Sequence, residues 1–90
     1  MNLGIIGNGG REHSLCFKLL KSSKVNKIFC IPGNAGTNEI AENVDIDVLD
    51  FENIYDFVKK NNIQILIVGP EAPLVHGIVD FFEDKNIKIF

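Results

Sequence analysis

The chain has 90 residues, of which 46% are hydrophobic, and a formal net charge of −3 at pH 7. This length allows one domain with a modest core, and the apolar content excludes a disordered chain. The negative charge argues against nucleic acid or an anionic membrane as a partner. No apolar run reaches the roughly 20 residues that a membrane helix needs. The amino-terminus leads directly into a strand-like segment, so we expect no signal peptide and a cytoplasmic protein.

The first half of the chain predicts two strands on either side of a helix. Apolar runs predict a buried strand over 3–6 and a second strand over 25–31, which Pro32-Gly33 ends. Between them, apolar residues at helical spacing predict a helix over 11–23, with one face formed by Leu15, Leu19 and Leu20. The segment 32–46 is expected to be mostly loop, with a helical turn and a short strand at 44–46.

The second half predicts two helices and two strands. Asp50 is a natural N-cap for a helix over 51–62, where apolar residues recur at i, i+3, i+4 and i+7. The β-branched run 63–68 predicts a central strand, and 87–90 predicts a final one. The segment 73–86 predicts a helix that carries an apolar stripe and one helix-weakening glycine, namely Val75, Ile78, Val79, Phe82 and Gly77.

This order of elements predicts a Rossmann-like, doubly wound α/β fold. Its parallel sheet of four or five strands should be covered by helices on both faces. We expect residues 1–90 to form a single substrate-binding domain. The chain stops at Phe90, on a strand end where a functional loop should begin, so we expect it to be the amino-terminal part of a longer protein.

Cysteines and acidic residues receive ordinary structural interpretations. Cys16 and Cys30 lie far apart on apolar segments, which predicts two buried, reduced thiols. Between Ile28 and Val58 there is no Lys or Arg, and a solvated acidic face is favoured over a metal site because the acids lack the spacing of a calcium loop. These acids are Glu39, Glu42, Asp45, Asp47, Asp50, Glu52 and Asp56.

Three loops rich in Gly, Pro and Asn follow predicted strands. They read GNGGREH from Gly7, PGNAGT from Pro32 and GPEAPL from Gly69. Ligands of this architecture bind beyond the carboxyl ends of the strands, and in a parallel sheet these ends lie along one edge. The three loops together therefore predict a ligand site at that edge.

The first loop departs from a dinucleotide fingerprint. Gly7 and Gly9 fit G-x-G-x-x-G, but the third glycine position holds Glu12. The acid that would hold a ribose hydroxyl at the end of the second strand is replaced by Pro32-Gly33. No Gly-Lys-Ser/Thr of a Walker A loop occurs. We therefore expect neither NAD nor FAD to bind.

With the dinucleotide and Walker A interpretations excluded, the first loop is interpreted as a glycine-rich turn at a helix N-terminus. Free amides of Asn8, Gly9 and Gly10 would suit an anion such as a phosphate. The alternative is a tight turn that needs positive φ and binds nothing.

Four polar side chains near the loops are candidates for a functional or a structural role. Glu71, between two prolines, either accepts from ribose hydroxyls or an amine, or is an exposed glutamate or helix cap. Arg11 either clamps a phosphate or pairs with an acid such as Glu12. His13, in a first helical turn, can face the site or not, and His76 is interpreted as a packing or surface residue.

In this order and spacing, GNGGREH, PGNAGT and VGPEAPLV resemble the amino-terminal domain of the phosphoribosylamine–glycine ligase (glycinamide ribonucleotide synthetase) family, over essentially the whole chain. The resemblance implies a purine-biosynthesis ligase that uses ATP and magnesium to join glycine to 5-phosphoribosylamine through glycyl phosphate. The family's ATP-grasp and carboxyl-terminal domains are missing here. We expect ATP and Mg²⁺ to bind mainly there, this domain to pack on them, and the 90-residue fragment alone to bind no cofactor and to be inactive.

The resemblance also implies site residues. Those expected to line the phosphoribosylamine site are Gly7, Asn8, Gly9, Gly10 and Arg11, and those expected to form a second wall are Gly33, Asn34, Ala35 and Gly36. Glu71 would orient the ribose or the reacting amine. We expect no catalytic residue or metal ligand in this chain, and the phosphate is not assigned to a loop. The alternatives are the first domain of another ATP-grasp enzyme acting on a related ribonucleotide, and a non-enzymatic assembly domain without a ligand at this edge.

Overall fold

A five-stranded, all-parallel sheet forms the centre of the molecule, and the computed structural model describes it together with every other part of residues 1–90. The strand order is β3-β2-β1-β4-β5. In chain order the strands are β1 (Asn2–Gly7), β2 (Lys27–Pro32), β3 (Glu42–Asn43), β4 (Ile63–Val68) and β5 (Lys88–Ile89). Because β1 pairs with both β2 and β4, the order reverses beside it, as the Rossmann-like prediction requires.

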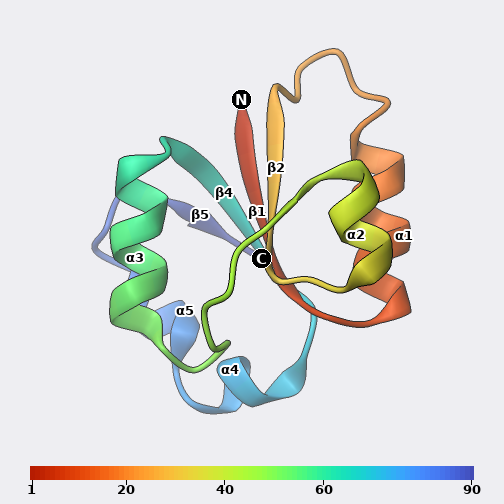
Figure 1. Cartoon of the computed structure of the whole chain (residues 1–90). Helices are drawn as coiled ribbons and strands as arrows, with labels where there is room; N and C mark the ends of the chain where they lie inside the picture. The colour runs from red at the N-terminus through yellow and green to blue at the C-terminus, as the bar shows by residue number, and fades with distance from the viewer.

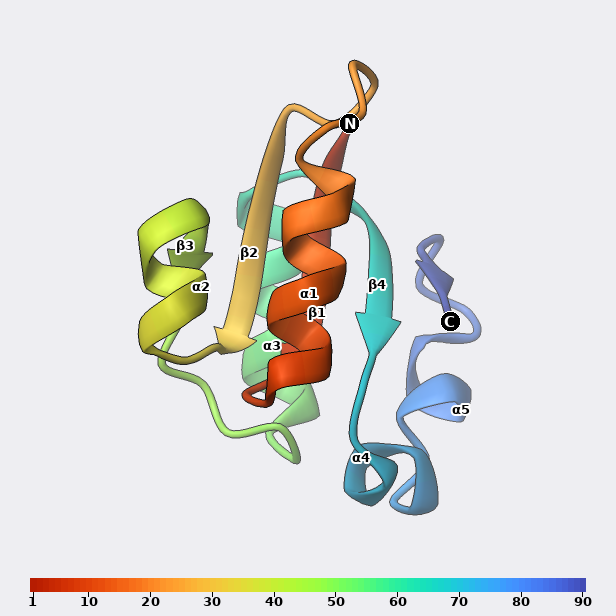
Figure 2. The ribbon, with the colours of Figure 1, turned by 90° about the vertical axis from the view of Figure 1, so that its right-hand side faces the viewer.

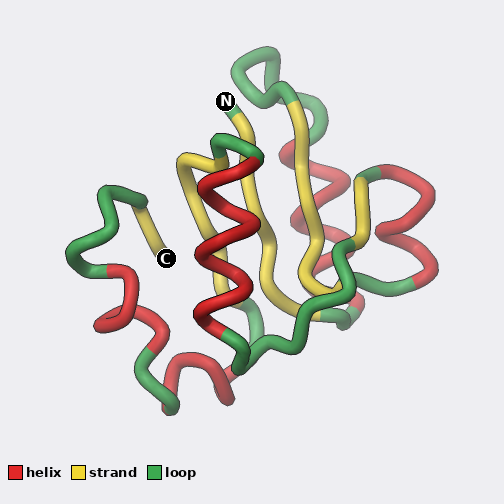
Figure 3. Tube along the Cα trace, turned by 60° about the vertical axis from the view of Figure 1, so that its left-hand side comes forward, coloured by secondary structure: helices red, strands yellow, loops and turns green.

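Helices cover the two faces of the sheet, with α1 (Gly10–Leu19) and α2 (Ala35–Ile40) on one face and α3 (Phe51–Lys60) and α5 (Ile78–Phe82) on the other. Figures 1 and 3 show the sheet between these two layers, and α4 (Glu71–Val75) near the ends of the strands. None of these helices combines the length and apolarity that a membrane crossing requires.

The core has two sides because successive side chains of a strand point to opposite faces of the sheet. On β1, Leu3 and Ile5 pack toward α1, while Ile6 packs toward α3 and α5. The buried residues on the α1 side are Leu3, Ile5, Cys16, Ile28 and Cys30. Those on the α3 side are Ile6, Phe29, Ile31, Ile54, Val58, Ile63, Leu66, Ile78 and Phe82. This pattern explains the continuous apolar runs of β1 and β2, which are buried on both faces.

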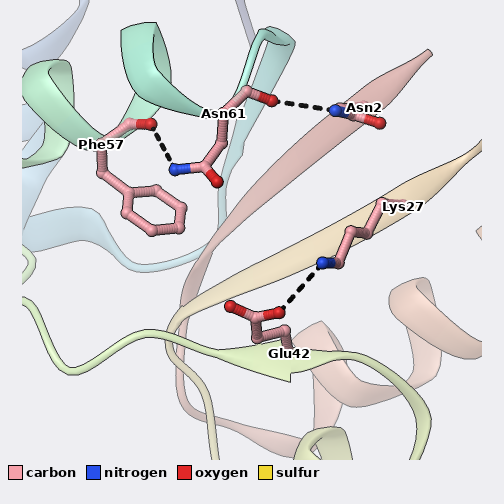
Figure 4. Close-up of polar contacts among 5 residues, drawn as sticks. All are labelled: Asn2, Lys27, Glu42, Phe57 and Asn61. Carbon is pink, nitrogen blue, oxygen red and sulfur yellow. Dashed lines mark hydrogen bonds and ion pairs between the residues drawn. The ribbon is translucent and has the colours of Figure 1, made fainter.

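Polar contacts fix the elements at the opposite end of the sheet from the three loops (Figure 4). The side-chain amide of Asn61 donates to the carbonyl of Phe57 at 2.9 Å and so closes the end of α3. The Asn61 carbonyl in turn accepts from the side-chain amide of Asn2 at 2.8 Å. Lys27 on β2 pairs with Glu42 on β3 at 3.1 Å, but both side chains are exposed, so this pair contributes little to stability.

The predicted helix over 73–86 is wrong, since α4 and α5 are two short helices. Gly77 separates them with a left-handed conformation, φ 89° and ψ 27°, which glycine adopts without steric cost and which ends the first helix. Ile78 is buried as the predicted stripe requires. Val75 and Val79 are instead 80% and 44% exposed, because the break turns the two helices apart.

Other boundaries differ from the predicted ones. The segment 32–46 contains the helix α2, and its short strand is β3 at 42–43 rather than 44–46. The reason is a cap, since the Asn34 side chain accepts from the Thr37 amide at the start of α2. Helix α1 starts at Gly10 and ends at Leu19 instead of residue 23, and this leaves Leu20 40% exposed.

The remaining predicted elements are present, although three strands have shifted bounds: β1 covers 2–7 rather than 3–6, β2 covers 27–32 rather than 25–31 and includes Pro32, and β5 covers 88–89 rather than 87–90. Strand β4 has the predicted bounds of 63–68, and α3 lies within the predicted 51–62. Asp50 caps α3, as predicted, by accepting from the amide of Asn53.

Cys16 on α1 and Cys30 on β2 are both free and fully buried between the helix and the sheet, as predicted. Burial raises the pKa of the Cys16 thiol. Burial, assisted by the neighbouring Cys16, raises the pKa of Cys30 to about 12. Both thiols therefore stay protonated near neutral pH and behave as small core residues.

Phe82→Ala should destabilise the domain by about 3–5 kcal/mol, since it removes a fully buried ring that contacts Tyr55 and Phe81. Val79→Ala on the same helix is the matched control, expected to change the free energy of unfolding by less than about 0.5 kcal/mol because Val79 is exposed. Urea unfolding followed by circular dichroism measures both. Equal losses for the two variants would contradict this assignment of the core.

The folded chain should resist labelling by a thiol-specific disulfide reagent at about pH 8, where both buried thiols remain protonated. In concentrated guanidinium chloride both Cys16 and Cys30 should react, because unfolding exposes them. Labelling is followed by absorbance. Native labelling at the denatured rate would show that the thiols are accessible and the burial is wrong.

Candidate functional site

The three loops after β1, β2 and β4 meet at one edge of the sheet, as predicted. The strands β2 and β4 run in the same direction and their arrowheads end at this edge (Figure 2). Backbone hydrogen bonds join the loops to β1. The amide of Gly33 donates to the Gly7 carbonyl at 3.1 Å, and the amide of Gly69 donates to the Ile6 carbonyl at 2.9 Å. The loops are thus held at fixed positions relative to one another.

The first loop, residues 7–10, presents unused donors. The amides of Asn8 and Gly9 donate to no backbone carbonyl or side chain. Gly9 is the N-cap of α1 in an extended conformation, so these amides lie at the positive end of the helix dipole. Asn8 and Gly10 are exposed. This arrangement has the donors and the polarity that an anion site needs.

Asn34 of the second loop, residues 32–36, joins that loop to the first. Its side-chain oxygen accepts from the Thr37 amide at 2.9 Å. Its side-chain nitrogen donates to the carbonyl of Asn8 at 2.9 Å and lies 3.3 Å from that of Gly9. Both ends of this amide are therefore used within the protein. Asn34 positions the first loop, while neighbouring Ala35 is exposed at the same edge.

Thr37 and Asn43 complete this connection, although neither was among the predicted site residues. The Thr37 hydroxyl is fully buried, accepts from the Asn34 amide at 2.7 Å and lies 2.7 Å from the Asn43 side-chain oxygen. The Asn43 amide donates to the Asn34 carbonyl at 2.7 Å. The Asn-x-x-Thr spacing resembles a capping box and was the available signal for Thr37, whereas nothing in the local sequence indicates Asn43.

Arg11 connects the first loop to the third, residues 69–71. Its guanidinium donates to the Gly69 carbonyl, and it forms no ion pair with Glu12 or another acid. A guanidinium has five N–H donors, and this side chain is exposed, so donors remain for a ligand. Glu71 is the exposed first residue of α4, and its carboxylate has no hydrogen bond or ion pair in the protein.

Glu12 explains two of the glycines at this edge. Its side chain is only 7% exposed and lies between Gly7 and Gly69. A Cβ on Gly7 would come 2.6 Å from the Glu12 Cγ, and one on Gly69 would come 2.8 Å from the same atom. Neither is sterically possible, so both glycines make room for this glutamate. In the sequence Glu12 is a departure from the dinucleotide fingerprint, but the glycines at two strand ends already indicated a close approach.

The two histidines have structural positions. A Cβ on Gly36 would come 2.7 Å from the His13 ring, which therefore packs between α1 and the second loop. The His76 ring nitrogen Nδ1 lies 2.8 Å from the Ala72 carbonyl at the end of α4. No group of three or more His, Cys, Asp or Glu side chains is arranged to hold a metal ion.

Comparison with solved structures supports the fold. A phosphoribosylamine–glycine ligase from Thermotoga maritima superposes with a TM-score of 0.63 over 79% of this chain and 16% of its own, at 22% identity. At that identity the likeness concerns the fold alone.

Sequence comparisons are more specific. A family model described as phosphoribosylglycinamide synthetase, N domain, matches residues 1–90. Two curated relatives, the phosphoribosylamine–glycine ligases from Caldanaerobacter subterraneus and Pseudomonas aeruginosa, are 51% and 54% identical to this chain over its whole length. The chain spans 22% and 21% of their lengths, or about a fifth of these curated relatives. The chain therefore belongs to the family of phosphoribosylglycinamide synthetase N domains.

Proposed function

We propose that this chain is the substrate-receiving domain of a ligase that joins glycine to 5-phosphoribosylamine and forms glycinamide ribonucleotide in purine biosynthesis. One observation carries the proposal. In a chain of this family, the three loops are tied together at one edge and expose amide donors, a guanidinium and a free carboxylate. This combination suits a small molecule that has a phosphate, hydroxyls and an amine.

The three loops have separate roles in this proposal. The first loop with Arg11 provides N–H donors for oxygen atoms of the substrate. The second loop, residues 33–36, forms a wall and holds the first loop through Asn34. Glu71 accepts from the ribose hydroxyls or from the reacting amine. None of these residues is placed to act as a nucleophile or an acid–base pair, so the domain binds and orients the amine that attacks the activated glycine.

No feature of these residues supports an ATP or Mg²⁺ site. The chain has no Walker A loop, and no group of carboxylates is arranged to hold a metal ion. We propose that both bind mainly to the part of the longer protein outside these residues, where ATP would supply the phosphoryl group that activates the glycine carboxylate.

An apolar surface supports packing against other parts of a longer protein. On the α1 side, no helix lies in front of β4 and β5 (Figure 2). A hollow of about 380 Å³ opens there, lined by Met1, Leu3, Leu15, Leu19, Ser22, Lys24, Val25, Ile65, Ile67 and Phe90. Of these, Phe90 is 68% exposed. Since exposed apolar hollows of this kind favour contact with other protein surfaces, we propose that this one packs against the ligase's other domains.

The full-length ligase should form glycinamide ribonucleotide from glycine, ATP and phosphoribosylamine generated in the assay, and the 90-residue chain alone should not. Product is measured by mass spectrometry at equal protein concentrations. No product from the full-length protein would overturn the proposed function, and product from the isolated chain would show that the ATP site lies within it.

Glu71→Ala in the full-length protein should raise the KM for phosphoribosylamine about tenfold or more, because it removes a charged hydrogen-bond acceptor. The KM for ATP should change by less than about twofold, since the substitution removes no group from the ATP site. Glu83→Ala, an exposed glutamate beyond α5, is the control for loss of a surface charge. Unchanged steady-state constants for phosphoribosylamine would remove Glu71 from the site.

A further inference from the structure

We infer that Glu12 is a substrate-binding residue, whose buried carboxylate accepts hydrogen bonds from the amine and hydroxyl end of phosphoribosylamine and keeps the phosphate end away. The inference rests on the proposed function and adds a residue and a direction of binding to it. Three features of the site carry it.

The first feature is that the Glu12 side chain is largely enclosed and that its carboxylate has no partner in the protein. The residue is 7% exposed, yet its oxygens accept no hydrogen bond and enter no ion pair. Its N3 position in α1 would allow it to cap the helix, but no side-chain cap bond forms there. Neighbouring Arg11 donates to the Gly69 carbonyl instead. No polar side-chain atom that is sealed from solvent lacks a partner, so the carboxylate oxygens remain accessible, and an external N–H or O–H donor could form a charge-assisted hydrogen bond with them.

The second feature is its place in the fold. Gly7 ends β1, and Gly69 directly follows β4, so Glu12 lies where the strand order reverses. From this point α1 runs along one face of the sheet, whereas the chain after β4 leads into α4 near the ends of the strands (Figure 1). In open parallel sheets this is the position of the ligand crevice. A Cβ on either Gly7 or Gly69 would overlap the glutamate side chain, so the two glycines leave room for it.

The third feature is charge. The N-terminus of α1 and the free amides of Asn8 and Gly9 favour an anion. The Glu12 carboxylate has the opposite effect on an anion, since it lies next to Gly9. A Cβ built on Gly9 would come 3.2 Å from its Oε2 atom. A phosphate close to this carboxylate would be repelled, whereas N–H and O–H donors would be attracted. The ribosylamine end of the substrate is therefore the part that reaches Glu12, and the phosphate points outward toward the exposed side of the loops.

The test uses Glu12→Gln and Glu12→Asp in the full-length ligase. Gln keeps the size but removes the charge, and Asp keeps the charge but retracts it by one methylene. Each should raise the KM for phosphoribosylamine about tenfold or more, because each weakens a charge-assisted hydrogen bond. The KM values for ATP and glycine should stay within about twofold, because neither is bound by this carboxylate. Glu52→Gln is the matched control, since Glu52 also lies in the first turn of a helix but is exposed.

A thermal unfolding midpoint for each variant separates binding from folding. Neutralising an unpaired buried carboxylate should not lower the midpoint of Glu12→Gln, whereas a purely structural role would lower it and leave the KM for phosphoribosylamine unchanged. If the Gln variant does not fold, the Asp variant decides, and a KM within about twofold of the wild-type value overturns the inference. Wild-type protein that makes no ribonucleotide would overturn the proposed function and this inference with it. Wild-type activity with unaltered Glu12 variants would overturn this inference alone.

Discussion

The arrangement depends on β1, a strand that is paired on both sides and buried on both faces. Its neighbours β2 and β4 are parallel to it, and the apolar side chains of Leu3, Ile5 and Ile6 anchor the two halves of the core. Because β1 stands where the strand order reverses, the loop that follows its last residue lies at the edge where ligands bind in open parallel sheets. The same hydrophobic constraint that stabilises the sheet therefore determines where the first loop can be.

The loops at that edge are held by polar contacts that the core alone would not supply. Asn34 joins the second loop to the first, and Arg11 joins the first to the third. Side-chain freedom is lost before any ligand arrives, so less of it remains to be lost on binding. The residues that face outward keep free donors and acceptors, among them Glu71 and the amides of Asn8 and Gly9. Some polar groups therefore fix the loops, and others stay free to bind a ligand. This division supports a binding site at this edge.

Glu12 shows how a motif can change meaning with structure. In the linear sequence it appears as a missing third glycine, and that absence is the reason for setting aside a dinucleotide. In the folded chain its side chain occupies space that Gly7 and Gly69 leave open. The glycines at this edge thus serve a close approach by the protein itself as well as a turn of the chain. A carboxylate at the N-terminus of α1 also restricts which part of a ligand can enter there.

The sequence by itself determined the order of strands and helices, the parallel α/β fold, the buried cysteines and the three loops that share an edge. These features follow from apolar periodicity, turn residues and the rule that parallel strands present their carboxyl ends together. Only the tertiary structure decided the break at Gly77, the cap at Asn34 that creates α2, and the exposure of Val75. It also decided the partners of Arg11 and the burial of Glu12. The Arg11 partner and the enclosure of Glu12 depend on contacts with Gly69, far away in the chain, which local spacing does not encode. The cap at Asn34 and the break at Gly77 are local, but residue types alone permit several conformations there, and packing in the folded chain selects one.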